Sequence, residues 1–365
     1  MDDKAKVPVG EPGTPEASTS HNRKAWTTKK VSLESSDHNY HSVNLTPSVN
    51  LLCSIPLVAT NSFYDGQIYV GVKDSIFEGS DPVRHMIELL QVLRKEYEEF
   101  PPYLSIFSDG GADHNVTFLY VQCALLALFR IGNFDILNAG RCAPNQSYIN
   151  PAERCMSHLN IGLQGLALDR DHMGPFEDSM KSCTSMKAIR AKSKQQQGLK
   201  EAYQSSVENP RRLVETSFEM LELKDKPVKI FKSNNQGDEI VTSLNTIDSK
   251  ITSVATIPHH QAKLDKYPDL KKFMDTHLTK TLYMLQYRKC DNFQCCQRKK
   301  ETLPPKIPAP VLSPDKVHYL PFHSLYGKVE TTASDCPSLQ PKNVKKDKNE
   351  AGFKFVASRV VAKIQ

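Results

Sequence analysis

The sequence lacks a long uninterrupted run of apolar residues. Its longest apolar run, residues 121–131, is broken by Gln122 and Arg130. It is also shorter than the roughly 18 to 20 apolar residues that a membrane-spanning helix needs. The opening residues, Met1 to Lys4, are mostly polar and do not resemble a signal peptide. We therefore expect no membrane partner and a reducing compartment, either the cytosol or the nucleus.

A strong charge of either sign is also missing. The 365 residues carry a formal net charge of only +6 at pH 7, which by itself is weak support for a polyanionic partner. The basic residues gather late in the chain, however, in residues 288–300 and again in residues 342–348. This clustering points to nucleic acid more strongly than the total charge does.

Paired Cys-x-x-Cys motifs are absent, although the chain has nine cysteines. Because a reducing compartment disfavours disulfides, we interpret the cysteines as free thiols or metal ligands. Cys123, Cys142 and Cys155 lie on or beside predicted core elements, so we interpret these three as small buried hydrophobic residues.

Hydrophobic spacing predicts alternating strands and helices in the first half of the chain. Alternating or short buried apolar runs predict strands at residues 43–57, 66–77, 103–107 and 134–139. Apolar residues at helical spacing predict helices at residues 81–100, 117–131 and 152–168. Strands that precede such an alternation favour a mixed sheet with helices on both faces. We therefore expect an α/β fold with the element order of an RNase H-like domain, built on a mixed five-stranded sheet.

Changes in composition divide the chain into five predicted segments. These are an RNase H-like domain (1–175), a Lys- and Gln-rich linker or solvated helix (176–200), a helical extension (201–287), a segment rich in Cys and Pro (288–330) and a basic tail (331–365). Within the helical extension, residues 268–286 are amphipathic and predict a helix. We expect the basic tail to be disordered.

Two acidic residues stand where a two-metal nuclease needs carboxylates. Asp109 ends a predicted strand, and the two glycines after it allow a sharp turn and close approach of a phosphate backbone. Glu153 lies just inside a helix that opens with Asn150 and Pro151. Magnesium prefers such hard oxygen ligands. Taken singly, each acid has a plainer interpretation, as a turn residue or as a first-turn acid favoured by the helix dipole.

Taken together, the two local motifs resemble the Tc1/mariner-type transposases. In that family a strand-ending Asp is followed five residues later by His, as Asp109 is by His114, and an Asn-Pro-x-Glu sequence opens the catalytic helix, as at residues 150–153. Further short motifs are similar to a group of transposon-derived proteins of animals. They are Gly10–Gly13, Leu45–Ser48, Phe63–Gln67, Val72–Asp74 and the pairs Lys289–Cys290 and Cys295–Cys296. The likeness covers most of residues 1–330.

This resemblance implies DDE-type phosphoryl transfer with two Mg²⁺ or Mn²⁺ ions. Asp109 and Glu153 would bind the ions, and the third carboxylate would come from the acidic doublet, with Asp2 preferred and Asp3 as the alternative. His114 would orient a carboxylate or the scissile phosphate, or else is a helix N-terminal histidine without such a role. The gap between Asp109 and Glu153 is longer than in the Tc1/mariner pattern. The resemblance also implies a strand and a DNA-binding head before Asp2, so we expect an N-terminally truncated copy.

Basic residues close to these motifs are candidate nucleic-acid contacts. They are Lys4, Arg141 and Arg154 beside the acids, and Arg298, Lys299 and Lys300 after the cysteines. Surface ion pairs are the competing interpretation. DNA is the expected partner and the nucleus the expected location, and oligomerisation is left open.

Cys290, Cys295 and Cys296 have a spacing that would supply three ligands of a structural zinc site. The fourth ligand would be His277, His318 or Cys336, and free cysteines are the alternative interpretation.

The first hypothesis for function is therefore a transposase-derived, metal-dependent nuclease or DNA strand-transfer domain, active or inactive in this copy. Two alternatives stay open. One is a non-catalytic nucleic-acid-binding relic of a transposase, and the other is a protein-interaction module built on residues 200–287.

Overall fold

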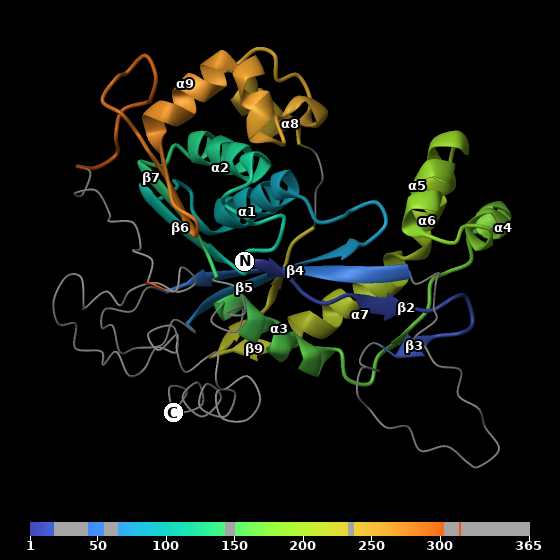
Figure 1. The fold of residues 1–365 in the computed structure, drawn as a ribbon. Coiled ribbons are helices and arrows are strands. Elements are labelled where there is room, and N and C mark those ends of the chain that lie inside the picture. The colour runs from blue at the N-terminus through green and yellow to red at the C-terminus, as the bar shows by residue number, and fades with distance from the viewer. Residues whose placement is uncertain (18–42, 55–64, 143–149, 233–236, 303–313, 315–365) are drawn as a thin grey trace. The chain divides into compact units, whose positions relative to one another are not determined.

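The computed structural model describes residues 1–17, 43–54, 65–142, 150–232, 237–302 and 314. The described residues form a mixed α/β protein (Figure 1), as the sequence predicts. They separate into two compact units whose segments alternate along the chain. Unit 1 comprises Met1–Leu51, Gln67–Val92 and Ala152–Gln236, and unit 2 comprises Leu52–Gly66, Leu93–Pro151 and Gly237–Gln365. The predicted segment 1–175 is thus shared between the two units.

Unit 1 is built on a mixed sheet. Its strands are β1 (Asp2–Asp3), β2 (Val7–Val9), β4 (Val43–Cys53), β5 (Gly66–Asp74) and β11 (Lys229–Ile230). Both β1 and β2 pair antiparallel with β4, whereas β11 runs parallel to β5. Side chains are buried along most of β4 and β5. In β4, buried apolar residues such as Leu45 alternate with buried polar residues such as Asn44 and Thr46, so side chains on both faces of the strand are shielded from solvent.

Helices supply the rest of the unit 1 core. They are α3 (Pro151–Gly162), α4 (Glu177–Lys181), α5 (Met186–Gln195), α6 (Leu199–Ser206) and α7 (Glu208–Glu219). Short strand pieces accompany them, namely β3 (Glu16–Ala17) with β8 (Ala167–Leu168) and β9 (Glu222–Leu223) with β10 (Lys226–Pro227). Leu45 and Val70 of the sheet share one hydrophobic cluster with Leu159 of α3 and Phe218 of α7. Helix α1 (Pro82–Glu96) begins in this unit, and its backbone N–H at Val83 is capped by Asp81.

Of the two alternatives for residues 176–200, a linker or a solvated helix, the structure has helices. This stretch forms α4, α5 and the start of α6, and Ile189 and Leu199 are buried in the unit 1 core. Its many Lys and Gln residues occupy the outer face of helices whose inner face is apolar. The Lys- and Gln-rich composition favoured a linker, whereas the spacing of the buried apolar residues is that of amphipathic helices.

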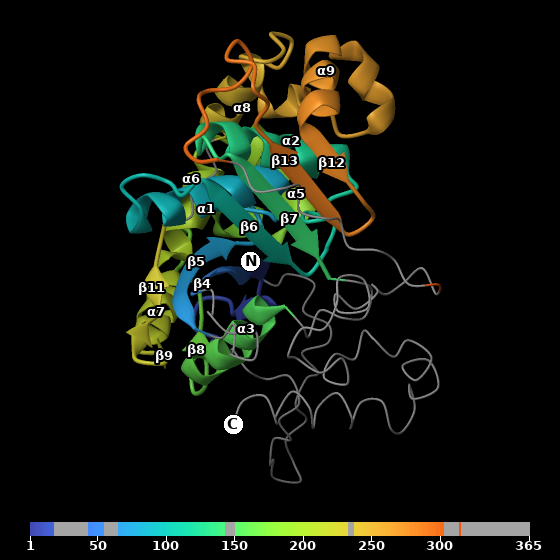
Figure 2. The same cartoon turned by 90° about the vertical axis from the view of Figure 1, so that its left-hand side faces the viewer.

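Unit 2 has its own four-stranded mixed sheet, ordered β12 (Leu278–Lys280), β13 (Met284–Arg288), β7 (Ile136–Arg141) and β6 (Tyr103–Ser108). Figure 2 shows these four strands side by side. Only β6 and β7 run parallel. The strongly apolar α2 (Leu119–Ile131) packs on β7 and β13 and also on α8 (Asp238–Asn245), which explains its almost complete burial. Helix α9 (Pro268–His277) leads into β12.

Two details of the predicted fold differ from the structure. The strands predicted at residues 103–107 and 134–139 form, but among the described residues they pair in the unit 2 sheet and not in one five-stranded sheet with β4 and β5. The helix predicted over residues 268–286 stops at His277, and a β-hairpin follows. Thr and Tyr residues in this hairpin favour a strand, and β13 forms a ladder with β7 along its full length. No helix among the described residues is long and apolar enough to span a membrane.

Candidate functional site

The acidic doublet lies on β1, where Asp2 pairs with Val49 and Asp3 with Ser48 of β4. The side chain of Asp2 is buried, and its Oδ1 accepts the backbone N–H of Asp3 at 2.8 Å. Successive side chains of a strand point to opposite faces. The two carboxylates therefore belong to different surroundings.

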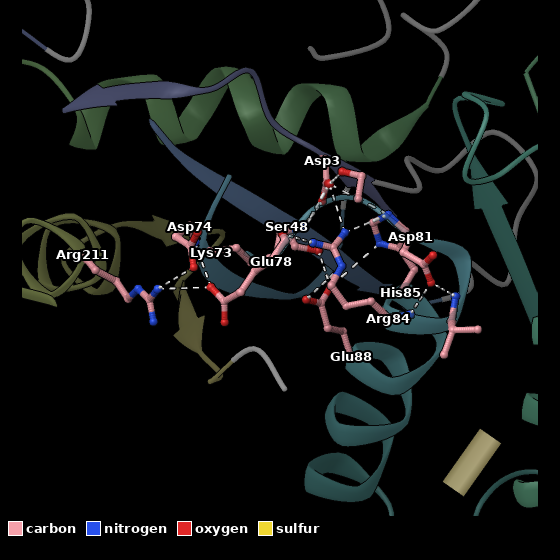
Figure 3. A network of polar contacts seen from close by, with 12 residues as sticks. Asp3, Ser48, Lys73, Asp74, Glu78, Asp81, Arg84, His85, Glu88 and Arg211 are labelled. Atoms are coloured by element: carbon pink, nitrogen blue, oxygen red, sulfur yellow. Dashed lines mark hydrogen bonds and ion pairs between the residues drawn. The ribbon is translucent and has the colours of Figure 1, made fainter. Parts of the chain in front are cut away.

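The carboxylate of Asp3 is held by a buried network of charges (Figure 3). Lys73 Nζ lies 2.9 Å from both of its oxygens, Arg84 Nη2 lies 3.1 Å from Oδ2, and Ser80 donates a hydrogen bond to it. Burial opposes the charge of Asp3, but electrostatic interactions with His85 and Arg84, together with hydrogen bonds from Ser80 and Arg84, outweigh it and hold the pKa of Asp3 below its ordinary value. A metal ion at Asp3 would have to compete with two fixed cations, so Asp3 is a poor metal ligand.

The same network continues to Glu88, which is fully buried. Arg84 Nε lies 3.7 Å from Glu88 Oε1, and Ser48 Oγ donates to Glu88 Oε2 at 2.7 Å. Lys73 and Arg84 are also fully buried. Buried charges persist only when they are paired, and here two carboxylates meet two cations. Sequence reasoning missed these residues. The sequence feature that could have indicated them is the i,i+4 spacing of Arg84 and Glu88 in α1, which allows an ion pair within one helix.

Glu153 lies in the first turn of α3, as the Asn-Pro-x-Glu motif predicts. It interacts electrostatically with Lys4, which raises the pKa of Lys4, while burial lowers that pKa more strongly. The backbone N–H of Lys4 donates to the carbonyl oxygen of Pro47 and so extends the pairing of β1 with β4. Lys4 is two residues beyond Asp2, so their side chains point to the same face of this extended segment. Unit 1 therefore brings the Asp2 strand close to Glu153.

Asp109 and His114 belong to unit 2. Asp109 directly follows β6, and its Oδ1 accepts the backbone N–H of Gly111 at 3.0 Å. Gly110 has a φ of +88°, a left-handed conformation in which other residues are strained. The chain then folds back, because the backbone N–H of His114 donates to the carbonyl oxygen of Gly111, and His114 is buried. The predicted order of strand, acid and glycine turn is confirmed.

Three of the six basic residues predicted to bind nucleic acid have side-chain partners inside unit 2. Arg141 Nε donates to the carbonyl oxygen of Leu282 at 3.1 Å, and its guanidinium lies over the ring of Tyr283. Lys300 Nζ donates to the carbonyl oxygen of Phe100 at 2.7 Å. Lys299 pairs with Asp291. The remaining three differ in exposure: Lys4 is buried, Arg154 is half-buried and Arg298 is exposed.

Unit 2 also gathers the three predicted zinc cysteines around a histidine. One ligand atom from each of His277, Cys290, Cys295 and Cys296 lies within 4.8 Å of every other. Nε2 of His277 is 3.4 Å from Sγ of Cys295 and 3.3 Å from Sγ of Cys296. Of the three predicted fourth ligands, His277 is therefore the one found at the cysteines. His318 and Cys336 lie outside the described residues.

Comparisons with protein-family models, curated proteins and solved structures find no match to this chain.

Proposed function

We propose that this chain is a transposase-derived phosphoryl-transfer domain of the DDE type, with an RNase H-like ancestry, that acts on DNA phosphodiesters. Asp2, Asp109 and Glu153 are its metal-binding carboxylates. The observation that carries the proposal is the position of the two motif acids, since Glu153 lies in the first turn of α3 and Asp109 directly follows β6 before a left-handed glycine.

Within unit 1, we assign different roles to Asp2 and Asp3, the two members of the acidic doublet, because their surroundings differ. Asp3 is neutralised by Lys73 and Arg84 and holds β1 against the neighbouring elements. Asp2 points to the opposite face, where Lys4 provides a positive charge close to Glu153.

Within unit 2, Asp109 stands at the carboxyl end of β6, a strand in parallel pairing with β7. Ligands of α/β sheets bind preferentially at the carboxyl ends of parallel strands. The left-handed Gly110 turns the chain directly after Asp109 and lies against the side chain of Arg141, where a Cβ would be crowded. His114 is held by the turn that follows and would position a phosphate or a carboxylate.

The donor set fits a hard divalent cation, because all three proposed ligands are carboxylates. When bound, two Mg²⁺ or Mn²⁺ ions would activate the attacking water or DNA 3′-hydroxyl and stabilise the leaving oxygen in an in-line displacement. The protein's own contribution is to hold the carboxylates in place and to neutralise charge.

The test is cleavage of labelled DNA by the full chain with Mg²⁺ or Mn²⁺. Asp2→Asn, Asp109→Asn and Glu153→Gln should each reduce the rate by about 100-fold or more, since a metal ion contributes several kcal/mol of transition-state stabilisation. Glu219→Gln is the matched control, because Glu219 is an exposed glutamate of unit 1. Cleavage that needs no metal, or that survives all three substitutions, would contradict the proposal. Salt-sensitive DNA binding without any cleavage would favour the non-catalytic relic instead.

A further inference from the structure

The arrangement of His277, Cys290, Cys295 and Cys296 supports a conclusion that does not depend on phosphoryl transfer. We propose that these four residues form a closed structural zinc site in unit 2, with Nε2 of His277 and three thiolates as the ligands.

The β12–β13 hairpin brings the first two ligands together. Leu278 pairs with Tyr287 across the hairpin. His277 directly precedes this pair, and Cys290 follows three residues after it, so both lie at the open end of the hairpin. The pairing register therefore brings together His277 and Cys290, which flank the hairpin on either side.

A compact turn returns the other two cysteines to the same place. The backbone N–H groups of Cys295 and Cys296 both donate to the carbonyl oxygen of Asn292, at 3.0 and 2.9 Å. The backbone N–H of Gln294 donates to Oδ1 of the same asparagine at 2.9 Å. Asn292 thus fixes the turn through its backbone and its side chain. As a result, neighbouring cysteines face His277.

The tautomer of His277 is set by its other ring nitrogen. Nδ1 lies 2.7 Å from the carbonyl oxygen of Phe273. A carbonyl oxygen can only accept, so Nδ1 carries the proton, and in the neutral imidazole Nε2 carries the lone pair. That lone pair is on the nitrogen that lies nearest Cys295 and Cys296. Metal-bound histidines commonly donate their second N–H to a backbone carbonyl in this way.

The spacing of the donor atoms fits a tetrahedral ion. With Zn–S near 2.3 Å and Zn–N near 2.0 Å, tetrahedral geometry separates a sulfur and a nitrogen ligand by about 3.5 Å. The observed separations from His277 Nε2 are 3.4 Å to Cys295 Sγ and 3.3 Å to Cys296 Sγ. Three thiolates and one imidazole fill the four positions, which is typical of structural and not catalytic zinc.

A nearby cation offsets the charge of such a site. Zinc with three thiolates and a neutral imidazole carries a single negative charge. The guanidinium of Arg130 interacts electrostatically with Cys296 and Cys295. It also lies 5.3 Å from the ring centroid of Phe273, whose ring stacks on that of His277. The site would therefore be neutralised overall without a charge from outside unit 2.

The proposed role is to hold the segment from Lys289 to Glu301, in which the structure has no helix or strand. Both ends of this segment are tied to Asp135. Lys289 Nζ lies 2.8 Å from Asp135 Oδ1, and the backbone N–H groups of Lys300 and Glu301 donate to Oδ2. Between these ends the largest apolar side chain, Phe293, is exposed. Zinc would replace the missing hydrophobic core of the segment.

The first test is elemental analysis of the full chain, purified and kept reduced. We expect about one zinc per chain, and its loss in Cys290→Ser, Cys295→Ser, Cys296→Ser and His277→Phe. Cys53→Ser and Cys183→Ser are the matched controls, one an exposed and one a buried cysteine outside the cluster, and both should keep the metal. The proposal is overturned if reduced wild-type protein binds no zinc after incubation with it, or if the controls lose as much as the ligand variants.

A second readout stays informative if a ligand variant folds poorly. Cobalt(II) titrated into the metal-free wild-type chain should give the intense visible bands of a tetrahedral ion together with sulfur-to-cobalt charge transfer. Weak octahedral bands without charge transfer would overturn the proposal. These outcomes are independent of DNA cleavage, since a chain without nuclease activity can still bind zinc and a nuclease can lack this site.

Discussion

The ammonium nitrogen of Lys73 lies 2.9 Å from each carboxylate oxygen of Asp3. Lys73 is fully buried and Asp3 largely so. This ion pair therefore gives Asp3 a structural role that the adjacent Asp2 does not share. Asp3 stabilises unit 1, and Asp2 is left as the member of the doublet that we propose to bind metal.

Asp3→Asn should lower the free energy of unfolding by about 3 kcal/mol, because breaking a buried ion pair leaves uncompensated charge on Lys73 and Arg84. Asp2→Asn should cost about 1 kcal/mol or less, since asparagine can still accept the backbone hydrogen bond. Urea denaturation at neutral pH measures both. If Lys73→Met is added to Asp3→Asn, part of the loss should be recovered. Equal losses for the two single variants would show that Asp3 does not have this structural role.

Glu177 should make stability depend on pH in the acid range. Hydrogen bonds from the fully buried Arg170 lower the pKa of Glu177 to about 2, from an ordinary value of 4.5. Below the ordinary value the unfolded chain takes up a proton and the native chain does not. The contribution of Glu177, roughly 3 kcal/mol by linkage, is therefore complete above pH 4.5 and is lost as the pH falls toward 2.

The measurement is urea denaturation of wild type and Glu177→Gln at about pH 6 and at successively lower pH. Wild type should lose stability more steeply with falling pH than Glu177→Gln does, and the two curves should converge at the acid end. Glu219→Gln, at an exposed glutamate, should follow the wild-type curve. Parallel curves for wild type and Glu177→Gln would show that the pKa of Glu177 is not depressed.

Mn²⁺ or Mg²⁺ should raise the melting temperature of the chain if the three proposed carboxylates bind it. A ligand present at 100 times its dissociation constant stabilises the native state by about 2.7 kcal/mol. Asp109→Asn and Glu153→Gln should each remove most of this shift, while Glu219→Gln should keep it. A thermal scan that gives the same metal response in all four proteins would argue against the proposed ligands.

Local sequence patterns predict much of this fold. Met86, Leu89, Leu90 and Leu93 at helical spacing after Asp81-Pro82 correctly predict α1. The short apolar run before Asp109 correctly predicts β6, and Asn150-Pro151 correctly predicts the start of α3. In each case the signal lies within a few residues of the element, as capping and hydrophobic periodicity require.

Features that depend on distant partners could not be predicted in the same way. The β12–β13 hairpin has no glycine turn, and it is stabilised by the pairing of β13 with β7, about 150 residues earlier. Lys73 and Arg84 belong to residue types that are almost never fully buried. Their burial could not be predicted without knowing that the fold places Asp3 beside them. The cysteine spacing predicted three zinc ligands, but His277 was one of three candidates because only the folded hairpin places it beside Cys290.

The last prediction separates DNA binding from catalysis. Binding dominated by phosphate contacts weakens with salt, with a log–log slope of about −0.9 per neutralised phosphate of duplex DNA. Arg298 is exposed, so Arg298→Ala should flatten the slope by about one if this side chain contacts a phosphate. Lys300→Gln should change the slope less, because Lys300 Nζ already donates to the carbonyl oxygen of Phe100.

Glu153→Gln should leave the slope nearly unchanged while it abolishes metal-dependent cleavage, because a carboxylate that binds metal neutralises no phosphate. Titrations of labelled duplex at several salt concentrations measure all three variants. If wild type shows no salt-sensitive binding to any nucleic acid, both the nuclease and the nucleic-acid-binding relic are refuted, and the protein-interaction hypothesis takes their place.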